Sequence, residues 1–392
     1  MDFHKRVLVI GTGKSGVNAG RVLWKKGAEL VLYDDKADLD IEKLLAQFEQ
    51  REGIRVVLGE INDAILSGID LAVISPGVPL DSEVANAVKN RNIPIWSEIE
   101  LAYRVGAGHL AAITGTNGKT TTTALVGEIF HHYTANSYTV GNIGIPYTEV
   151  APGMNEDTYT VAEVSSFQLE TIDTFCPHVA AILNVTPDHL DRHGTMNNYA
   201  SVKLEIGRNQ TEEDYLILNY DDPITKRMAK DERVRAKVVF FSRLHNLDEG
   251  ICLEEDAIVL REQGSQTKVI DCSELILLGG HNIENYMAGI GVAYYMGIPM
   301  EVIQKTLREF EGVAHRIEFV RETGGVAYYN DSKGTNPDAA IRAIQAMNRK
   351  TVLIGGGYDK QIPFDDWIKA FDGKVKKLVL LGQTAQTIEE TA

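Results

Sequence analysis

Cysteine is scarce in this sequence, and the marks of secreted or membrane-bound chains are missing from it. The 3 cysteines among 392 residues, Cys176, Cys252 and Cys272, are too few for a disulfide framework and lack the spacing of a metal site. No apolar run approaches the ~18 residues of a membrane span, and no signal-peptide-like apolar stretch precedes the first predicted strand. We therefore expect a cytoplasmic protein with no membrane insertion.

Positive charge is also in short supply. The chain has 39 lysines and arginines against 55 aspartates and glutamates, which gives a formal net charge of -16. Nucleic-acid binders generally need a basic surface, so this balance excludes binding of a phosphate backbone as the main activity. Short-period repeats and low-complexity tracts are absent as well. Because 392 residues exceed what one hydrophobic core usually supports, two or three globular domains are expected.

What the sequence does contain is an α/β pattern. Short β-branched apolar runs alternate with stretches of helical periodicity, which is typical of parallel βαβ units. The expected strands are 6–10, 30–33, 71–74, 110–113, 159–164, 179–184, 351–354 and 377–381. Gaps and composition divide them into three domains, which we expect at residues 1–98, 99–311 and 312–392.

The first glycine loop, from Gly11 to Gly16, follows a predicted strand and opens a helix, and Asp34 and Asp35 end the next strand. This is the dinucleotide-binding pattern, in which glycines admit a pyrophosphate to the helix N-terminus and an acidic residue accepts bonds from a ribose. On its own it favours a nicotinamide enzyme. Another nucleotide diphosphate or a purely structural tight turn are the alternatives.

The second glycine loop, residues 114–121, also lies between a predicted strand and a helix that is expected near Thr122. Its backbone N–H groups, Lys119 and the Thr120 hydroxyl suit a nucleotide phosphate and Mg²⁺. Ile113 stands where the general phosphate-loop pattern has a glycine, so a glycine turn with a solvated lysine is the alternative. An oxidoreductase has no evident need for this loop, which weakens the nicotinamide interpretation.

The string Gly-Thr-Asn-Gly-Lys-Thr from Gly115 to Thr120 resembles the loop of Mur ligases and the related folylpolyglutamate synthetases. The segment Glu-Val-Ser-Ser-Phe-Gln-Leu-Glu, from Glu163 to Glu170, resembles that of the member that adds D-glutamate. Five further blocks match in the family's order: 184–192, 199–203, 280–285, 315–316 and 330–336. The resemblance implies a Rossmann-like N-terminal domain, a central phosphate-loop ATPase-like α/β domain and a C-terminal Rossmann-like α/β domain.

The activity implied by this resemblance is that of an ADP-forming acid–amino-acid ligase of peptidoglycan precursor synthesis, and thus of cell wall formation, cell shape and cell division. D-glutamate would be joined to UDP-N-acetylmuramoyl-L-alanine through an acyl phosphate made with ATP and two Mg²⁺ ions, by a monomeric enzyme. A sibling ligase for another amino acid, a nicotinamide oxidoreductase and a non-catalytic nucleotide-binding regulator are the competing classes. The residues from Ser166 to Leu169 speak against the sibling.

The resemblance also assigns residues to roles. Uridine-substrate contacts would be Ser15, Asp34, Asp35, Gly77, Asn142, Ser165, Gln168 and His189. ATP contacts would be Gly115, Thr116, Asn117, Gly118, Lys119, Thr120, Thr121, Asn282, Asn285, Arg316 and Asp331. Magnesium ligands would be Thr120, Glu163, His189 and Lys203, D-glutamate contacts Thr335 and Lys360, and catalytic residues Lys119, Glu163, His189, Lys203 and Lys333.

Each role has a plainer alternative. Lys203, which the resemblance makes a carbamylated lysine, is otherwise a solvated helix lysine. Asn142 is otherwise a turn residue, Asn282 a helix cap, and His193 is expected to be a loop histidine. The family also continues past Thr391 and Ala392 with a serine and an aromatic contact for D-glutamate, so we expect the end of the third domain to be missing and ligation by this chain to be poor.

Overall fold

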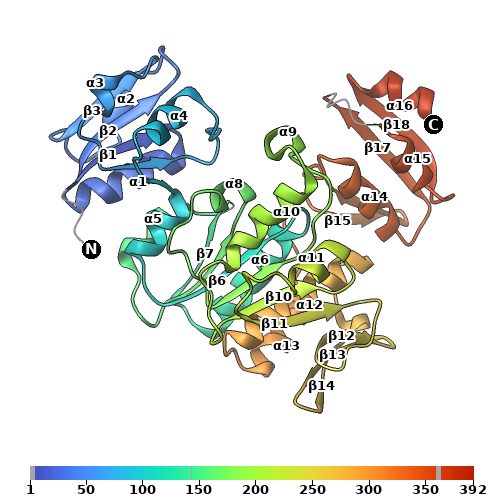
Figure 1. Cartoon of the computed structure of the whole chain (residues 1–392). Coiled ribbons are helices and arrows are strands. Elements are labelled where there is room, and N and C mark those ends of the chain that lie inside the picture. Colours follow the sequence, from blue (N-terminus) through green and yellow to red (C-terminus); the bar gives the residue numbers. More distant parts are fainter. Residues whose placement is uncertain (1–4, 143, 359–362) are drawn as a thin grey trace.

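The computed structural model of the chain describes residues 5–142, 144–358 and 363–392. The first domain is a five-stranded parallel sheet of order β3-β2-β1-β4-β5, and its helices lie on both faces (Figure 1). Its elements are β1 (Arg6–Ile10), α1 (Lys14–Lys25), β2 (Glu29–Asp34), α2 (Ile41–Leu45), β3 (Ile54–Leu58), α3 (Asp63–Leu66), β4 (Leu71–Ile74), α4 (Glu83–Asn90) and β5 (Ile95–Ser97).

The central region is built on a nine-stranded sheet of order β14-β13-β12-β11-β10-β9-β6-β8-β7, in which β12, β13 and β14 pair antiparallel and the other pairs are parallel. Its strands are β6 (His109–Thr114), β7 (Ser137–Gly141), β8 (Tyr159–Glu163), β9 (Val179–Ile182), β10 (Tyr215–Asn219), β11 (Lys237–Ser242), β12 (Gly250–Glu254), β13 (Ala257–Glu262) and β14 (Ser265–Asp271). Its helices are α5 (Glu98–Val105), α6 (Lys119–Tyr133), α7 (Tyr147–Val150), α8 (Ser166–Leu169), α9 (Leu190–His193), α10 (Met196–Leu204), α11 (Pro223–Met228), α12 (Gly280–Tyr295) and α13 (Met300–Glu309).

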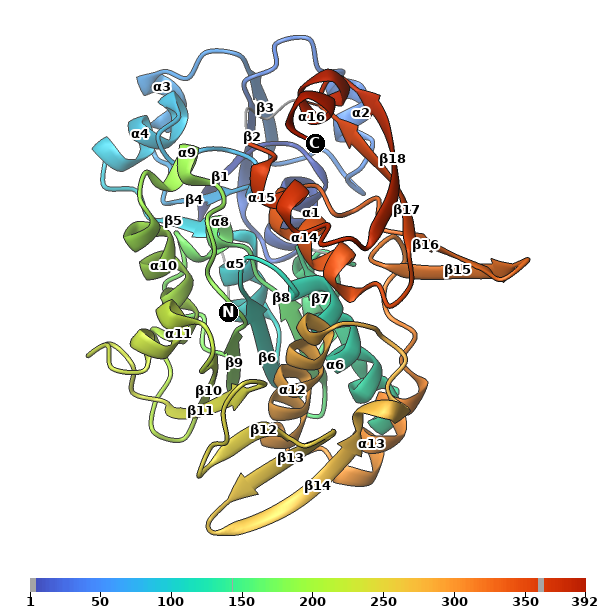
Figure 2. The same ribbon diagram turned by 90° about the vertical axis from the view of Figure 1, so that its right-hand side faces the viewer.

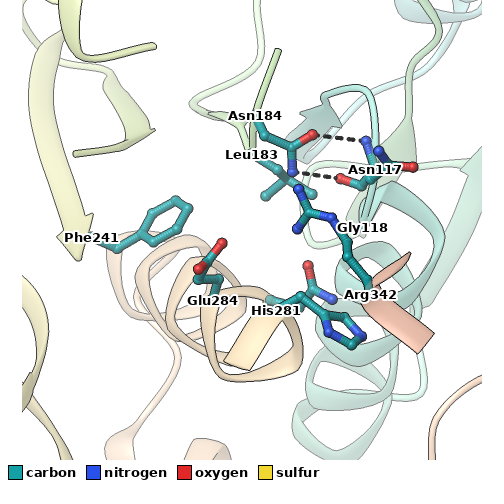
Figure 3. Close-up of a pocket in the computed structure, with 9 residues that line it drawn as sticks. Asn117, Gly118, Leu183, Asn184, Phe241, His281, Glu284 and Arg342 are labelled. Atoms are coloured by element: carbon teal, nitrogen blue, oxygen red, sulfur yellow. Dashed lines mark hydrogen bonds between the residues drawn. The ribbon is translucent and has the colours of Figure 1, made fainter. Parts of the chain in front are cut away.

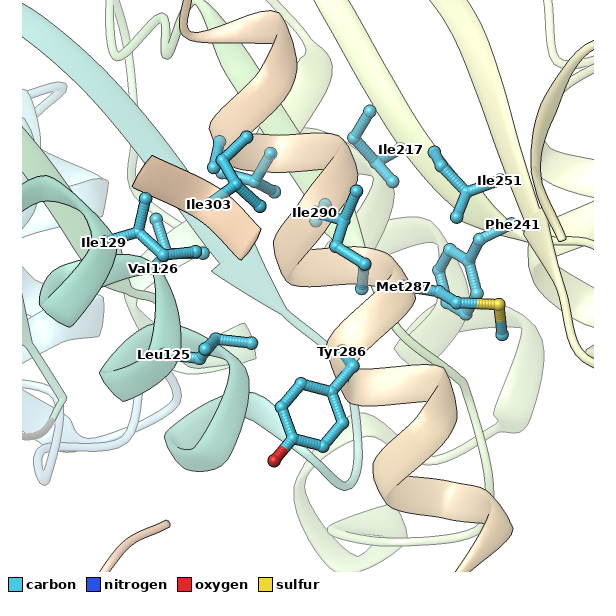
Figure 4. Packing of buried hydrophobic residues seen from close by; sticks show 14 of the residues in the cluster. Leu125, Val126, Ile129, Ile217, Phe241, Ile251, Tyr286, Met287, Ile290 and Ile303 are labelled. Carbon is cyan, nitrogen blue, oxygen red and sulfur yellow. The ribbon is translucent and has the colours of Figure 1, made fainter. Parts of the chain in front are cut away.

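The neighbouring parallel strands β8, β6, β9 and β10 of this sheet are buried on both faces. Residues Ala111 and Ile113 of β6 belong to the cluster formed with α6, α12 and α13, while Leu110 and Ala112 belong to the cluster on the opposite face. Figure 4 shows Ile290 of α12 and its neighbours packed between α6 and the strands. This burial on both sides explains why these strands are continuous apolar runs.

The C-terminal region contains the two expected strands as a pair and adds a hairpin that the sequence does not predict. It contains an antiparallel pair, β15 (Glu318–Thr323) with β16 (Val326–Asn330), and a parallel pair, β17 (Thr351–Gly357) with β18 (Val375–Gly382). Gly324 and Gly325 both have positive φ and close a tight hairpin, which forces the first pair to be antiparallel. The helices are α14 (Pro337–Ala346), α15 (Asp365–Lys369) and α16 (Ala385–Thr391).

Helix α5 follows the last strand of the first sheet and is fastened to the central region. The buried carboxylate of Glu98 accepts hydrogen bonds from the backbone N–H and the hydroxyl of Thr148, at 2.7 and 2.6 Å. Glu100, also buried, accepts bonds from three successive backbone N–H groups, those of residues 173–175, and from Arg104. Unpaired carboxylates would be costly to bury, so these bonds fix α5 in place.

The first and C-terminal regions lie on opposite sides of the same end of the central region (Figures 1 and 2). The loops that follow β6, β8 and β9 emerge at this end, because parallel strands end together at one edge of a sheet. In the described part of the chain, no helix is both long and apolar enough to cross a membrane.

Candidate active site

The first glycine loop follows β1 at the carboxyl edge of the first sheet, beside the loop that follows β4. These strands are neighbours whose chain connections leave in opposite directions, which is the usual ligand position in such sheets. The Ser75 hydroxyl donates to the Gly11 carbonyl at 3.0 Å, which joins the loop that contains Gly77 to the loop that leads to Ser15. One carboxylate oxygen of Asp34 accepts bonds from the Thr12 backbone N–H and hydroxyl, at 2.8 and 2.7 Å.

These bonds assign Asp34 a structural task that the sequence did not indicate, while Asp35 beside it is exposed. Burial alone would raise the pKa of Asp34, but the hydrogen bonds from Thr12 outweigh it and lower this pKa. The ionised carboxylate thus holds the glycine loop in shape, and its second oxygen accepts a bond from the backbone N–H of Lys36 at 3.3 Å.

The second glycine loop forms the turn between β6 and α6. The helix begins at Lys119, three residues before the expected start, because Gly118 adopts a φ of 86° and turns the chain into the helix. A Cβ atom at this position would meet the Asn285 side-chain oxygen at 2.3 Å, which only glycine avoids. The Lys119 ammonium is folded back onto the loop and donates to the carbonyls of Gly115 and Thr116, both at 2.8 Å.

The loop is held from the other side by Asn184, a residue that the sequence did not assign to the site. Its side-chain oxygen accepts from the Asn117 backbone N–H at 2.8 Å, and its side-chain nitrogen donates to the Asn117 carbonyl at 3.0 Å (Figure 3). Thr116 is also held by a hydrogen bond, because the backbone N–H of Thr186 donates to the Thr116 hydroxyl. The signal for Asn184 was its place directly after β9, at the edge where the loops meet.

Glu163, at the end of β8, is buried beside this loop. One carboxylate oxygen accepts from the Asn142 side-chain nitrogen at 2.9 Å, and the other is buried without a hydrogen-bond partner. An unpaired buried carboxylate oxygen is costly unless a cation or donor is supplied. Glu163 also lies close enough to Lys119 for its charge to act on the lysine pKa, although burial is stronger and lowers that pKa.

Lys203 of α10 is not the solvated lysine of the plainer alternative. Only 1% of the residue is exposed, its amine donates to the Gly115 carbonyl at 2.8 Å, and it lies 4.4 Å from the centre of the Tyr199 ring. Burial, followed by the neighbouring Lys119, lowers the pKa of Lys203 well below its usual value. Two amines, those of Lys119 and Lys203, therefore share one carbonyl oxygen in a low-dielectric site.

The residues expected to contact the uridine substrate near α8 are bonded to one another. Ser165 and Gln168 form the capping box of α8, in which the serine N–H donates to the glutamine side-chain oxygen at 3.0 Å. His189, half exposed, has a positive φ of 50° and lies 3.6 Å from the Asp188 carboxylate. His193, which was expected in a loop, is the last residue of α9 and is buried, and its ring forms a hydrogen bond with the Ser166 hydroxyl at 3.0 Å.

A pocket opens beside the phosphate loop, between the loop and the N-terminus of α12 (Figure 3). Phe241 and Leu183 supply apolar walls, and Asn117 and Glu284 supply polar groups. Other lining residues are Gly118, Asn184, His281, Asn285 and Arg342. Burial, with smaller effects of Arg342 and Arg243, lowers the pKa of His281 to about 4, so this ring is neutral near pH 7.

Of the two asparagines of α12 that are expected to contact ATP, Asn285 lines this pocket and Asn282 is bonded to it. The Asn285 side-chain nitrogen donates to the Asn282 side-chain oxygen at 3.1 Å, and both residues are buried. Asn282 donates to the Leu278 carbonyl at 2.7 Å, while Gly279 is the residue that caps the helix. The Thr122 hydroxyl reaches the Asn285 oxygen at 3.4 Å, which links α12 to the start of α6.

The C-terminal region contributes Arg316, whose guanidinium donates to the Thr120 hydroxyl at 3.4 Å and whose Nε is buried without a partner. Asp331 accepts from the backbone N–H of Ile317, and burial raises its pKa. Lys333 and Thr335 are exposed on the loop between β16 and α14. Lys360, the other expected D-glutamate contact, lies outside the described residues.

Few described protein groups around the phosphate loop could serve as magnesium ligands. Residues 5–142, 144–358 and 363–392 contain no group of three or more His, Cys, Asp or Glu side chains that lie close enough together to hold a metal ion. Mg²⁺ usually keeps several waters and binds one or two carboxylates together with substrate phosphates, so such a cluster is not required. The unpaired oxygen of Glu163 and the hydroxyl of Thr120 are donors of the kind that Mg²⁺ prefers.

Comparisons with known proteins agree with this architecture. Three family descriptions match in order: "Mur ligase MurD-like, N-terminal domain" over residues 5–97, "Mur ligase middle domain" over 113–293 and "Mur ligase, glutamate ligase domain" over 315–392. The UDP-N-acetylmuramoylalanine–D-glutamate ligase of Lachnoclostridium phytofermentans is 49% identical over 99% of this chain and 85% of the relative. That of Caldanaerobacter subterraneus is 48% identical with the same coverage of both chains.

Solved structures share the fold at lower identity. A UDP-N-acetylmuramoylalanyl-D-glutamyl-2,6-diaminopimelate–D-alanyl-D-alanyl ligase from Acinetobacter baumannii aligns with a TM-score of 0.61 and 18% identity, over 99% of this chain and 82% of that one. UDP-N-acetylmuramate-alanine ligase from Thermotoga maritima aligns with a TM-score of 0.59 and 21% identity, over 99% and 88%. By its three matched domains and its near relatives, the chain belongs to the Mur ligase family.

Proposed function

We propose that the chain is an ADP-forming ligase that joins D-glutamate to UDP-N-acetylmuramoyl-L-alanine in peptidoglycan precursor synthesis. The observation that carries this proposal is the gathering of Lys119, Lys203 and Glu163 around one phosphate loop, on a different sheet from the first glycine loop. Two nucleotides can therefore be held at once, ATP at one loop and the uridine substrate at the other. The near relatives that carry this ligase's name support the choice of amino acid.

The domain limits 1–98, 99–311 and 312–392 belong to the same proposal. They are supported by the end of β5 at Ser97, the fastening of α5 to the central region, and the gap between α13 and β15. A cytoplasmic location also belongs to it, because ATP is a cytoplasmic substrate and the described cysteines are free thiols.

The reaction requires an activated carboxylate, since a carboxylate does not form an amide with an amine unaided. The substrate carboxylate attacks the γ-phosphorus of ATP and ADP leaves, which gives an acyl phosphate. The D-glutamate amine then attacks the acyl carbon, loses a proton and expels phosphate. Lys119, once rotated away from its own loop, and Arg316 would offset the negative charge that two anions bring together.

The proposal also includes two magnesium ions. Glu163 and Thr120 would hold one ion, and His189 with a modified Lys203 would support a second. A bound Mg²⁺ supplies charge neutralisation on the transferring phosphoryl group. Asn142 keeps the Glu163 carboxylate in position through its 2.9 Å bond.

Carbamylation of Lys203 is supported by its burial against Lys119. The lone pair of the neutral amine attacks the carbon of CO₂, one N–H proton leaves, and the nitrogen then bears a carboxylate. This product would replace repulsion between two amines by attraction between an anion and the Lys119 ammonium. It would also provide the oxygen ligands that a lysine lacks.

The function is tested by ADP release from the full-length protein. Release should require ATP, UDP-N-acetylmuramoyl-L-alanine and D-glutamate together, and it should stop when D-glutamate is replaced by L-alanine or a diamino acid. Acceptance of another amino acid would identify a sibling ligase instead. A change in NADH fluorescence on mixing would indicate the oxidoreductase alternative.

Asn184 gives a prediction for the ATP half of the site. Asn184→Ala should raise the KM for ATP about tenfold, because a backbone N–H of the phosphate loop loses its partner at a cost of about 1–3 kcal/mol. The KM for the uridine substrate should stay unchanged. Asn209→Ala is the matched control, since that side chain also makes two bonds to the backbone, to the carbonyls of Asp173 and Phe175, away from the loop. A KM for ATP within twofold of wild type in Asn184→Ala would contradict the role.

A further inference from the structure

Arg192 makes contacts that the proposed chemistry does not use. It lies on the single-turn helix α9, which begins directly after His189. Its guanidinium is mostly buried. One nitrogen donates to the Glu170 carboxylate at 2.6 Å and another donates to the Pro76 carbonyl at 3.4 Å. The guanidinium carbon also lies 3.9 Å from the centre of the Phe167 ring.

The three partners belong to different parts of the site. Pro76 lies in the loop after β4, whose Ser75 hydroxyl bonds to the first glycine loop at Gly11. Phe167 and Glu170 belong to the segment around α8 in the central region. Arg192 therefore connects the edge that is proposed to bind the uridine nucleotide with the segment that the resemblance links to D-glutamate addition.

The same cluster orients the turn that carries His189. The Phe167 ring contacts His189 edge-on at 5.0 Å and stacks on His193 at 5.6 Å, while Arg192 covers it. The backbone N–H groups of Arg192 and His193 both donate to the His189 carbonyl. With its φ of 50°, His189 depends on these surroundings to keep a conformation that histidine seldom adopts.

We propose that Arg192 is a positioning residue that fixes the His189 turn against the uridine-binding edge of the first domain. This inference rests on the proposed function, because its readout is the uridine substrate of the ligase. An arginine suits the task, since its planar fork can bond a carboxylate and a carbonyl while its face covers a ring. A lysine retains the charge but cannot make the three contacts together.

Arg192→Lys in the full-length enzyme tests the inference. We expect kcat/KM for UDP-N-acetylmuramoyl-L-alanine to fall on the order of tenfold to a hundredfold, as expected for weakening a hydrogen bond to a charged group. The KM for ATP should remain within about twofold. Glu170→Gln weakens the same ion pair with little change of volume and should give the same pattern. The double variant should be no worse than the poorer single variant, since both act through one bond.

Arg104→Lys is a matched control. Arg104 is as buried as Arg192, bonds the carboxylates of Glu100 and Asp173, and covers the Trp96 ring at 4.0 Å, but it lies away from His189. This variant should unfold at a lower temperature and keep the wild-type kcat/KM for the uridine substrate. The variant thus shows the effect of replacing a buried arginine whose role is structural only.

The inference is overturned if Arg192→Lys and Glu170→Gln keep the wild-type kcat/KM for the uridine substrate. It is also overturned if the KM for ATP rises as much as that for the uridine substrate, or if Arg104→Lys gives the same kinetic pattern. A wild-type protein without D-glutamate-dependent ADP release would overturn the proposed function instead. The ADP release of the wild-type protein therefore distinguishes failure of the Arg192 inference from failure of the proposed function.

Discussion

Lys119→Ala is expected to abolish D-glutamate-dependent ADP formation, with kcat reduced by a factor on the order of a thousand or more, while the uridine substrate still binds. The lysine is the loop's own cation, and loss of one preorganised charge at a transferring group costs several kcal/mol of transition-state stabilisation. The two glycine loops belong to different sheets, so uridine binding should be nearly untouched.

The measurement combines ADP release with calorimetric titration of UDP-N-acetylmuramoyl-L-alanine. Lys226→Ala serves as the control. This lysine belongs to α11 and lies over the Tyr220 ring, away from both loops, so its substitution should leave both measurements unchanged. If uridine binding collapsed in Lys119→Ala while turnover survived, the assignment of the two loops would be reversed.

Lys203→Ala should lose activity by a factor on the order of a hundred or more and regain part of it with added formate or acetate. The substitution removes a buried charged group that, as a carbamate, would pair with Lys119 and a metal ion, and breaking such a buried pair costs about 3–5 kcal/mol. A short carboxylate fits the space that the missing side chain leaves beside Gly115.

The rescue must be specific to this position. Lys119→Ala should not respond to the same acids, because it lacks a cation rather than an anion. ADP release is followed over a series of formate and acetate concentrations at constant ionic strength, with chloride as the salt control. Full activity in Lys203→Ala without any acid would contradict the carbamate.

The strands that the sequence predicted well are the ones buried on both faces. The runs at 6–10, 71–74 and 110–113 became β1, β4 and β6 within one residue at each end, because full burial demands an uninterrupted apolar run. Strands β12–β14 were not predicted, and neither were β3, β5, β7, β10, β11, β15 and β16. Strands β12–β14 form an antiparallel extension of the central sheet, and β14 begins with exposed polar residues, Ser265 to Lys268, that give no apolar signal.

The site was predicted unevenly for a similar reason. Local patterns located both glycine loops, because a loop's own residues determine its backbone. Contacts between distant segments could not be read from a pattern. The bond between Asn184 and Asn117 joins residues 67 positions apart, and the burial of Lys203 depends on Gly115, 88 positions away. Family resemblance selected Lys203 for a role, but only the fold gives it an apolar environment.

The fastening of α5 has a consequence for protein engineering. Glu98 and Glu100 satisfy their carboxylates on groups of the central region, although Leu101 of the same helix packs in the core of the first domain. A hybrid enzyme that receives its uridine-binding domain from another ligase would inherit two mismatched buried acids if the graft ended after α5. The transplant should therefore end at Ser97, where β5 closes the donor sheet and the recipient's own helix begins.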